Sequence, residues 1–62
     1  MSQEAELRSF AAYLETGSVK AAAHKLGVHE QTVKKHLARL RARYGVRTNA
    51  QLADAIARII LR

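Results

Sequence analysis

The side chains with the most evident chemistry in this sequence are cations, and they gather in one segment. Residues 18–47 carry eight lysine and arginine side chains against one acid, Glu30, a net charge of +7, whereas the whole chain carries +6. The eight are Lys20, Lys25, Lys34, Lys35, Arg39, Arg41, Arg43 and Arg47. Because a basic surface attracts polyanions, this segment predicts a partner that carries phosphates, most simply a nucleic acid.

Other chemistries are excluded by what the sequence lacks. It has no cysteine, which excludes disulfides, thiolate metal sites and cysteine nucleophiles. His29 and His36 are seven residues apart, about 10.5 Å along a helix, too far to share a zinc ion. No acid–base pair, nucleophile with a base, or phosphate-binding loop can be assembled. We therefore expect no enzyme, no metal, no cofactor and no small-molecule ligand. No apolar run reaches about 18 residues, so no membrane span is expected either.

The chain is rich in strong helix formers and has no proline, so we expect helices to be the elements that position the cations. Glycines and capping residues divide residues 1–62 into four helices of a single all-α domain. The first is predicted over about residues 3–15. Its expected apolar stripe, at spacings i, i+3, i+4 and i+7, is Leu7, Phe10, Ala11 and Leu14.

Capping signals place the other three helices. Gly17 ends the first helix, and Ser18 caps a second that runs to about residue 26. The third covers about residues 30–44, and its inward residues are Val33, Leu37, Leu40 and Tyr44. Thr48 and Gln51 have the spacing of a capping box, which predicts a fourth helix over about residues 49–61. We expect His36 to be half-buried, His24 to be exposed, and His29 to lie at the cap of the third helix.

The strongest local motif joins the second and third helices. Ala23 and Gly27 are four residues apart, with a small residue where two helices cross and a glycine in the turn. This arrangement is typical of a helix-turn-helix, and the helix that follows it carries much of the basic segment. The agreement of the two signals predicts a double-stranded DNA partner.

Helical geometry indicates which side chains face the DNA. At about 100° per residue, Gln31, Lys35 and Ala38 point away from the apolar stripe of the third helix. A recognition helix presents such residues to base edges, where glutamine pairs with adenine, lysine with guanine, and alanine with the thymine methyl. Phosphate contacts are expected from Lys20, Thr32, Arg39, Arg41 and Arg43. The predicted DNA-binding residues are Lys20, Gln31, Thr32, Lys34, Lys35, Ala38, Arg39, Arg41 and Arg43.

At this point the residues resemble the LuxR/GerE-type helix-turn-helix domain over about residues 17–57. The resemblance rests on Gly27-Val28-x-x-x-Thr32-Val33-Lys34-x-His36-Leu37, then Tyr44-Gly45-Val46 and Ala50-Gln51-Leu52-Ala53. It implies a four-helix DNA-binding domain that regulates transcription, with the threonine on a phosphate and the lysines in the groove. His29 and Asn49 depart from that pattern. The Gly-Ser-x-x-Ala-Ala-Ala run also resembles the helix-turn-helix of PucR-type regulators and of Fis.

The fourth helix has more apolar surface than one neighbour can cover. Leu52, Ile56 and Ile59 cluster within about 60° and are expected to cap the core. The remaining apolar residues extend the arc to roughly 240°, against about 100° for an ordinary surface helix. The predicted homodimer interface is Ala53, Ala57, Ile60 and Leu61.

Three functions remain open from the sequence. The first is a sequence-specific DNA-binding transcriptional regulator acting as a homodimer, located in the cytoplasm with the nucleoid of a bacterium or phage-infected cell. The second is a small interaction protein that binds a larger regulator through its fourth helix. The third is a nonspecific nucleic-acid-binding protein.

Overall fold

The computed structural model describes residues 3–61 as four α-helices, and this range contains no strand. The helices are α1 (Gln3–Thr16), α2 (Val19–Leu26), α3 (Glu30–Tyr44) and α4 (Asn49–Ile60). The prediction of an all-α, four-helix domain is confirmed. The boundaries of α3 are those expected from the sequence, and α4 ends one residue earlier than expected, with Leu61 as its C-terminal cap.

The helix ends follow the capping residues. The Ser18 side chain accepts a hydrogen bond from the Ala21 amide at 3.0 Å, which satisfies one free donor at the start of α2. Thr48 Oγ1 accepts from the Gln51 amide, and Gln51 Oε1 accepts from the Thr48 amide, so the predicted capping box is present. Gly27 ends α2 with φ 68°, a left-handed conformation that residues with a Cβ atom rarely adopt.

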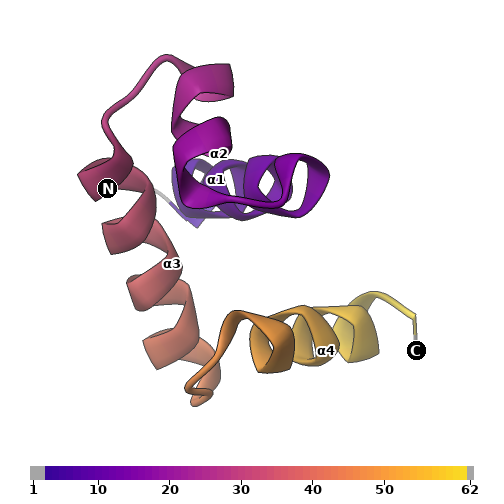
Figure 1. Ribbon diagram of the computed structural model, residues 1–62. Coiled ribbons are helices and arrows are strands. Elements are labelled where there is room, and N and C mark those ends of the chain that lie inside the picture. Colours follow the sequence, from indigo (N-terminus) through magenta and orange to yellow (C-terminus); the bar gives the residue numbers. More distant parts are fainter. Residues whose placement is uncertain (1–2, 62) are drawn as a thin grey trace.

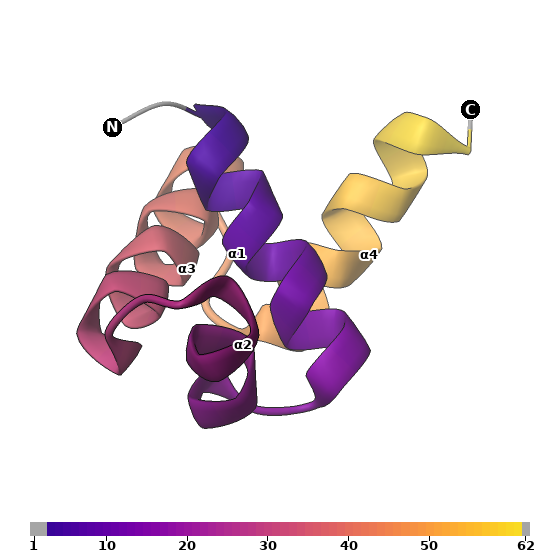
Figure 2. The ribbon, with the colours of Figure 1, turned by 90° about the horizontal axis from the view of Figure 1, so that it is seen from above.

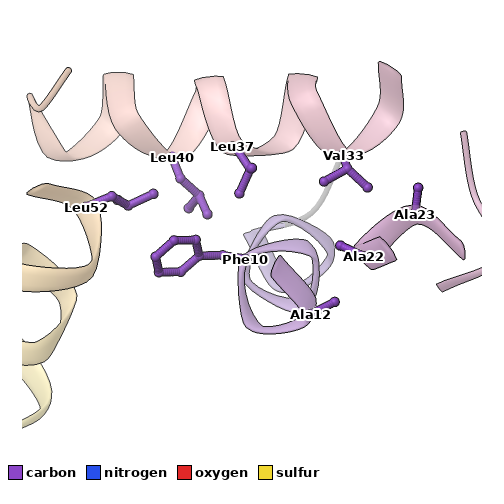
Figure 3. Packing of buried hydrophobic residues seen from close by; sticks show 8 residues of the cluster. All are labelled: Phe10, Ala12, Ala22, Ala23, Val33, Leu37, Leu40 and Leu52. Atoms are coloured by element: carbon purple, nitrogen blue, oxygen red, sulfur yellow. The ribbon is translucent and has the colours of Figure 1, made fainter. Parts of the chain in front are cut away.

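Helix α1 lies across both α2 and α3, whereas the backbone of α4 lies close to that of α3 alone among the helices (Figures 1 and 2). The core forms where these helices meet, and Figure 3 shows the ring of Phe10 beside Leu40 and Leu52. Val33, Leu37, Leu40 and Leu52 are each at most 1% exposed. Full burial of such a side chain contributes about 1.5–3 kcal/mol, so these few residues supply much of the stability of the domain. They also hold α3 with one face inward and the opposite face free.

The predicted apolar stripe of α1 is wrong except at Phe10. Leu7, Ala11 and Leu14 are exposed, and the buried face of α1 instead comprises Glu6, Ser9, Phe10 and Ala12. Two of these are polar, and both find polar partners on α3. A hydrophobicity pattern counts apolar residues and gives no weight to such pairs, so it assigned the wrong face of the helix.

Two expectations about burial also need correction. Ile59 was expected to cap the core, yet 51% of it is exposed, because α4 diverges from α1 toward its C-terminal end (Figure 2). Leu52 and Ile56 alone of that predicted cluster pack on the core. His36 is more deeply buried than expected, at 6% exposed, because its ring meets Ser9 between α1 and α3. His24 is exposed, as predicted.

Candidate nucleic-acid interface

The cations of the basic segment divide into those engaged within the protein and those that are not. Three have partners in the fold. Lys25 pairs with Glu15, Arg41 Nη1 donates to Asn49 Oδ1 at 2.6 Å, and Arg43 Nη1 donates to Glu6 Oε1 at 2.7 Å. The other five side chains have no ion pair or hydrogen bond within residues 3–61: Lys20, Lys34, Lys35, Arg39 and Arg47.

The arginines outside the segment do not add free charge within the described range. Arg8 pairs with Glu4 at 3.1 Å on α1, and Arg58 pairs with Asp54 at 3.1 Å on α4. Each pair is spaced i, i+4 and exposed, so it contributes little stability but locally neutralises its helix. The unengaged positive charge therefore lies on α2, on α3 and in the turn between α3 and α4.

The outward face of α3 is the centre of this charged surface. Gln31, Lys34, Lys35, Ala38 and Arg39 are exposed, and Thr32 is half-buried. Val33, Leu37 and Leu40 lie on the opposite, inward side of α3 and hold it on the core (Figure 3). The site thus combines amide and ammonium donors with a small side chain on one rigid helix. This combination can read base edges in a major groove, where lysine donates to guanine and glutamine pairs with adenine.

Helix α2 and its N-cap carry a second group of donors. Lys20 lies in its first turn and is exposed, and with Ser18, Ala21 and His24 it lines an open hollow of about 370 Å³. An ammonium group and an imidazole on the rim of a hollow are suited to a phosphate oxygen. His29, the residue before α3, makes no side-chain cap hydrogen bond.

Two polar contacts fix α3 against α1, and neither was predicted from the sequence. The hydroxyl of Ser9 and Nδ1 of His36 lie 2.6 Å apart in the interior, and the Glu6 carboxylate accepts from Arg43 near the C-terminal end of α3. Because Glu6 and Ser9 are polar, hydrophobic periodicity carried no signal for this inward face of α1. These contacts set the position of the helix that carries the free lysines.

The residues predicted for a dimer interface lie along α4. Ala53 and Ala57 are half-buried, whereas Ile60 and Leu61 are 72% and 80% exposed. No other part of residues 3–61 covers these last two side chains. The described helices include none long and apolar enough to cross a membrane, and residues 3–61 contain no cluster of three metal-ligating side chains.

Helices α2 and α3 form a helix-turn-helix motif, and α1 lies across both of them. The second helix of the motif carries unengaged cations. These features define a helix-turn-helix DNA-binding domain. The chain belongs to the lysR family of bacterial regulatory helix-turn-helix proteins, since that family's model matches residues 5–48. No curated protein and no solved structure matches the chain.

The family match refines the resemblance drawn from the sequence. The LuxR/GerE-type comparison indicated the helix-turn-helix class, and the family that matches is the lysR family. The matched segment covers most of α1, all of α2 and α3, and the turn up to Thr48. It stops immediately before α4, so the family assignment concerns the DNA-binding motif and leaves the role of α4 to physical argument.

Proposed function

We propose that this protein is a sequence-specific, double-stranded DNA-binding transcriptional regulator that acts as a homodimer with α3 in the major groove. One observation carries the proposal. The five cations that no side chain of residues 3–61 engages all lie on or beside the helix-turn-helix that the family model matches. Free charge gathered on the exposed face of a recognition helix attracts phosphates and presents donors to bases.

The roles of the interface residues follow from their positions. We assign base reading to four exposed residues of α3: Gln31, Lys34, Lys35 and Ala38. Lys20, Thr32 and Arg39 contact phosphates, and Arg47 joins them from the turn after α3. Arg41 and Arg43 serve in two ways. Each guanidinium has five N–H donors, so its contact inside the fold leaves others for a phosphate.

The homodimer proposal rests on uncovered apolar surface away from these cations. At the end of α4 it comprises Ile60 and Leu61, with the half-buried Ala53 and Ala57 on the same helix, and on α1 it includes the exposed Leu7 and Leu14. The ion pairs Glu4–Arg8 and Asp54–Arg58 make both helices locally neutral. Two copies of a chain with net charge +6 therefore meet with least repulsion here. A two-fold pair would present two α3 helices to half-sites about 10 bp apart.

We further place this activity in the cytoplasm of a bacterial cell, bound to the nucleoid, because the family consists of bacterial regulators. The exposed end of α4 favours one alternative, in which the same apolar residues bind a larger regulator and the chain alone does not bind DNA.

Selection from a pool of random duplexes, followed by fluorescence anisotropy on the selected site, tests the proposal. A dimer that neutralises on the order of 6–10 phosphates should lose ~10³–10⁵-fold in affinity between 50 and 200 mM salt. A flat salt response would contradict phosphate contacts. Enrichment of no sequence would favour nonspecific binding, and absence of binding would favour the interaction protein.

A further inference from the structure

Glu30 differs from the other carboxylates of the chain in having no cation paired with it. All five acidic side chains of the sequence lie within the described residues. The other four form ion pairs: Glu4 with Arg8, Glu6 with Arg43, Glu15 with Lys25, and Asp54 with Arg58. Glu30 is exposed and has no ion pair or hydrogen-bond partner for its side chain within residues 3–61.

The position of Glu30 makes this free carboxylate unusual. Glu30 is the first residue of α3, the end that a recognition helix presents to base edges. Lys34 follows at i+4, a spacing at which the two side chains are neighbours, yet they form no ion pair. Every other free side-chain charge assigned to the interface is positive. A carboxylate here repels phosphates and lowers affinity for DNA of any sequence.

A carboxylate in the first turn also stabilises a helix through its dipole, and this role requires no contact with DNA. This stabilisation of the helix does not depend on the bases in the duplex, however, so it leaves the sequence preference of the protein unchanged. Sequence preference therefore distinguishes a purely helical role from a role in recognition.

We infer that Glu30 is a specificity-determining residue whose carboxylate accepts a hydrogen bond from the N4 amino group of a cytosine in the major groove. The inference rests on the proposed function. A carboxylate accepts hydrogen bonds and donates none. Guanine and thymine present acceptors in the groove and repel it, and adenine sets its amino donor beside the N7 acceptor. Cytosine presents an amino donor alone, so it is the favoured base.

Helix geometry gives the inference a register. Glu30 and Lys34 are separated by about 6 Å along the axis of α3. Base pairs are stacked about 3.4 Å apart, so the two side chains span about two base-pair steps. If Lys34 donates to a guanine, the half-site carries a cytosine within about two base pairs of that guanine. The free carboxylate thus lowers affinity for most DNA sequences and offsets that loss only at a site with the cytosine in this position.

The experiment is duplex selection with the full chain and three variants, each confirmed as helical by circular dichroism. Glu30→Gln exchanges the carboxylate for a neutral amide of the same shape, and Glu30→Asp keeps the acceptor on a shorter side chain. Glu4→Gln is the matched control, because Glu4 is an exposed acid in the first turn of a helix outside the interface.

The wild-type protein should enrich one cytosine that Glu30→Gln no longer requires. Glu30→Gln should shift that position toward adenine, which glutamine pairs bidentately, and lose roughly 5- to 150-fold in preference for cytosine. Its affinity for a scrambled duplex should rise. Glu30→Asp should keep part of the preference, and Glu4→Gln all of it. If the wild-type protein selects a sequence and Glu30→Gln selects the same one, the inference about Glu30 is wrong and the proposed function still stands. A wild type that selects nothing overturns both this inference and the proposed function.

Discussion

At the scale of single residues, the partner of a cation within the fold determines what else that cation can do. Arg58 and Lys34 are both exposed cations on helices, but Arg58 has Asp54 one turn away and Lys34 has no partner in residues 3–61. A charge that is already paired adds little long-range attraction for phosphates. Arg58 and Lys34 contribute equally to the net charge of the chain, but only Lys34 has a charge that is not balanced by a neighbouring acid.

This difference leads to a comparison of alanine variants. Lys34→Ala and Lys35→Ala should each weaken binding to a selected site by ~1–3 kcal/mol if both lysines donate to bases. Arg58→Ala, the control, should change binding little, because its charge is balanced by Asp54 and lies on α4. Anisotropy titrations at one salt concentration give the comparison. An equal loss in all three variants would mean that only net charge matters and that α3 does not read the sequence.

At the scale of helices, polar contacts determine how α1 crosses α3. The carboxylate of Glu6 has a side chain only 2% exposed, and its charge is balanced by Arg43, whose side chain is 43% exposed. Burying a carboxylate without a partner is costly, whereas burying a leucine of similar size is favourable. The contact between Glu6 and Arg43 is therefore required chiefly because the acid is present.

A pair of variants tests this account. Arg43→Ala should destabilise the domain by about 2–4 kcal/mol, somewhat less than for a fully enclosed pair, because solvent reaches the guanidinium. Adding Glu6→Leu to that variant should recover most of the loss, since no charge is then left inside. Urea denaturation followed by circular dichroism measures both. If Glu6→Leu gave no recovery, the packing of the Arg43 side chain would be responsible rather than its charge.

At the scale of the whole molecule, charge and apolar surface are separated. Free cations lie on α2, α3 and the turn after α3, whereas five of the six exposed large hydrophobic side chains lie on α1 and at the end of α4. The five are Leu7, Leu14, Ile59, Ile60 and Leu61. This separation allows one surface to approach a duplex while another meets a second copy.

The proposed dimer predicts a result for one small residue of α4. Ala57→Glu should convert a dimer at micromolar concentration into a monomer, because a charge would be buried between two helices. It should also weaken binding to a duplex with two half-sites far more than to one with a single half-site. Gln51→Glu adds the same single charge on the polar face of α4, at a capping-box position that also accepts glutamate, and should leave the dimer intact. Sedimentation velocity decides, and a monomeric wild type, both free and on DNA, would rule the dimer out.

The four helices could be predicted from the sequence, because their boundaries depend on local signals. Ser18, Gly27 and the Thr48–Gln51 box act within one turn of chain, and each forms the cap that its spacing predicts. Most of the inward face of α3 was also predictable, since Val33, Leu37 and Leu40 form an apolar stripe, and the buried His36 is the one polar residue on that face. The basic character of residues 18–47 required only counting.

The inward face of α1 and the set of unengaged cations depend instead on contacts between distant parts of the chain. Glu6 and Ser9 are buried because Arg43 and His36, 37 and 27 residues away in sequence, supply their partners. Ile59 is exposed because α4 leaves the core, which depends on the direction of the turn after α3. Such outcomes depend on groups that are brought together only by folding, and short-range periodicity contains no information about them.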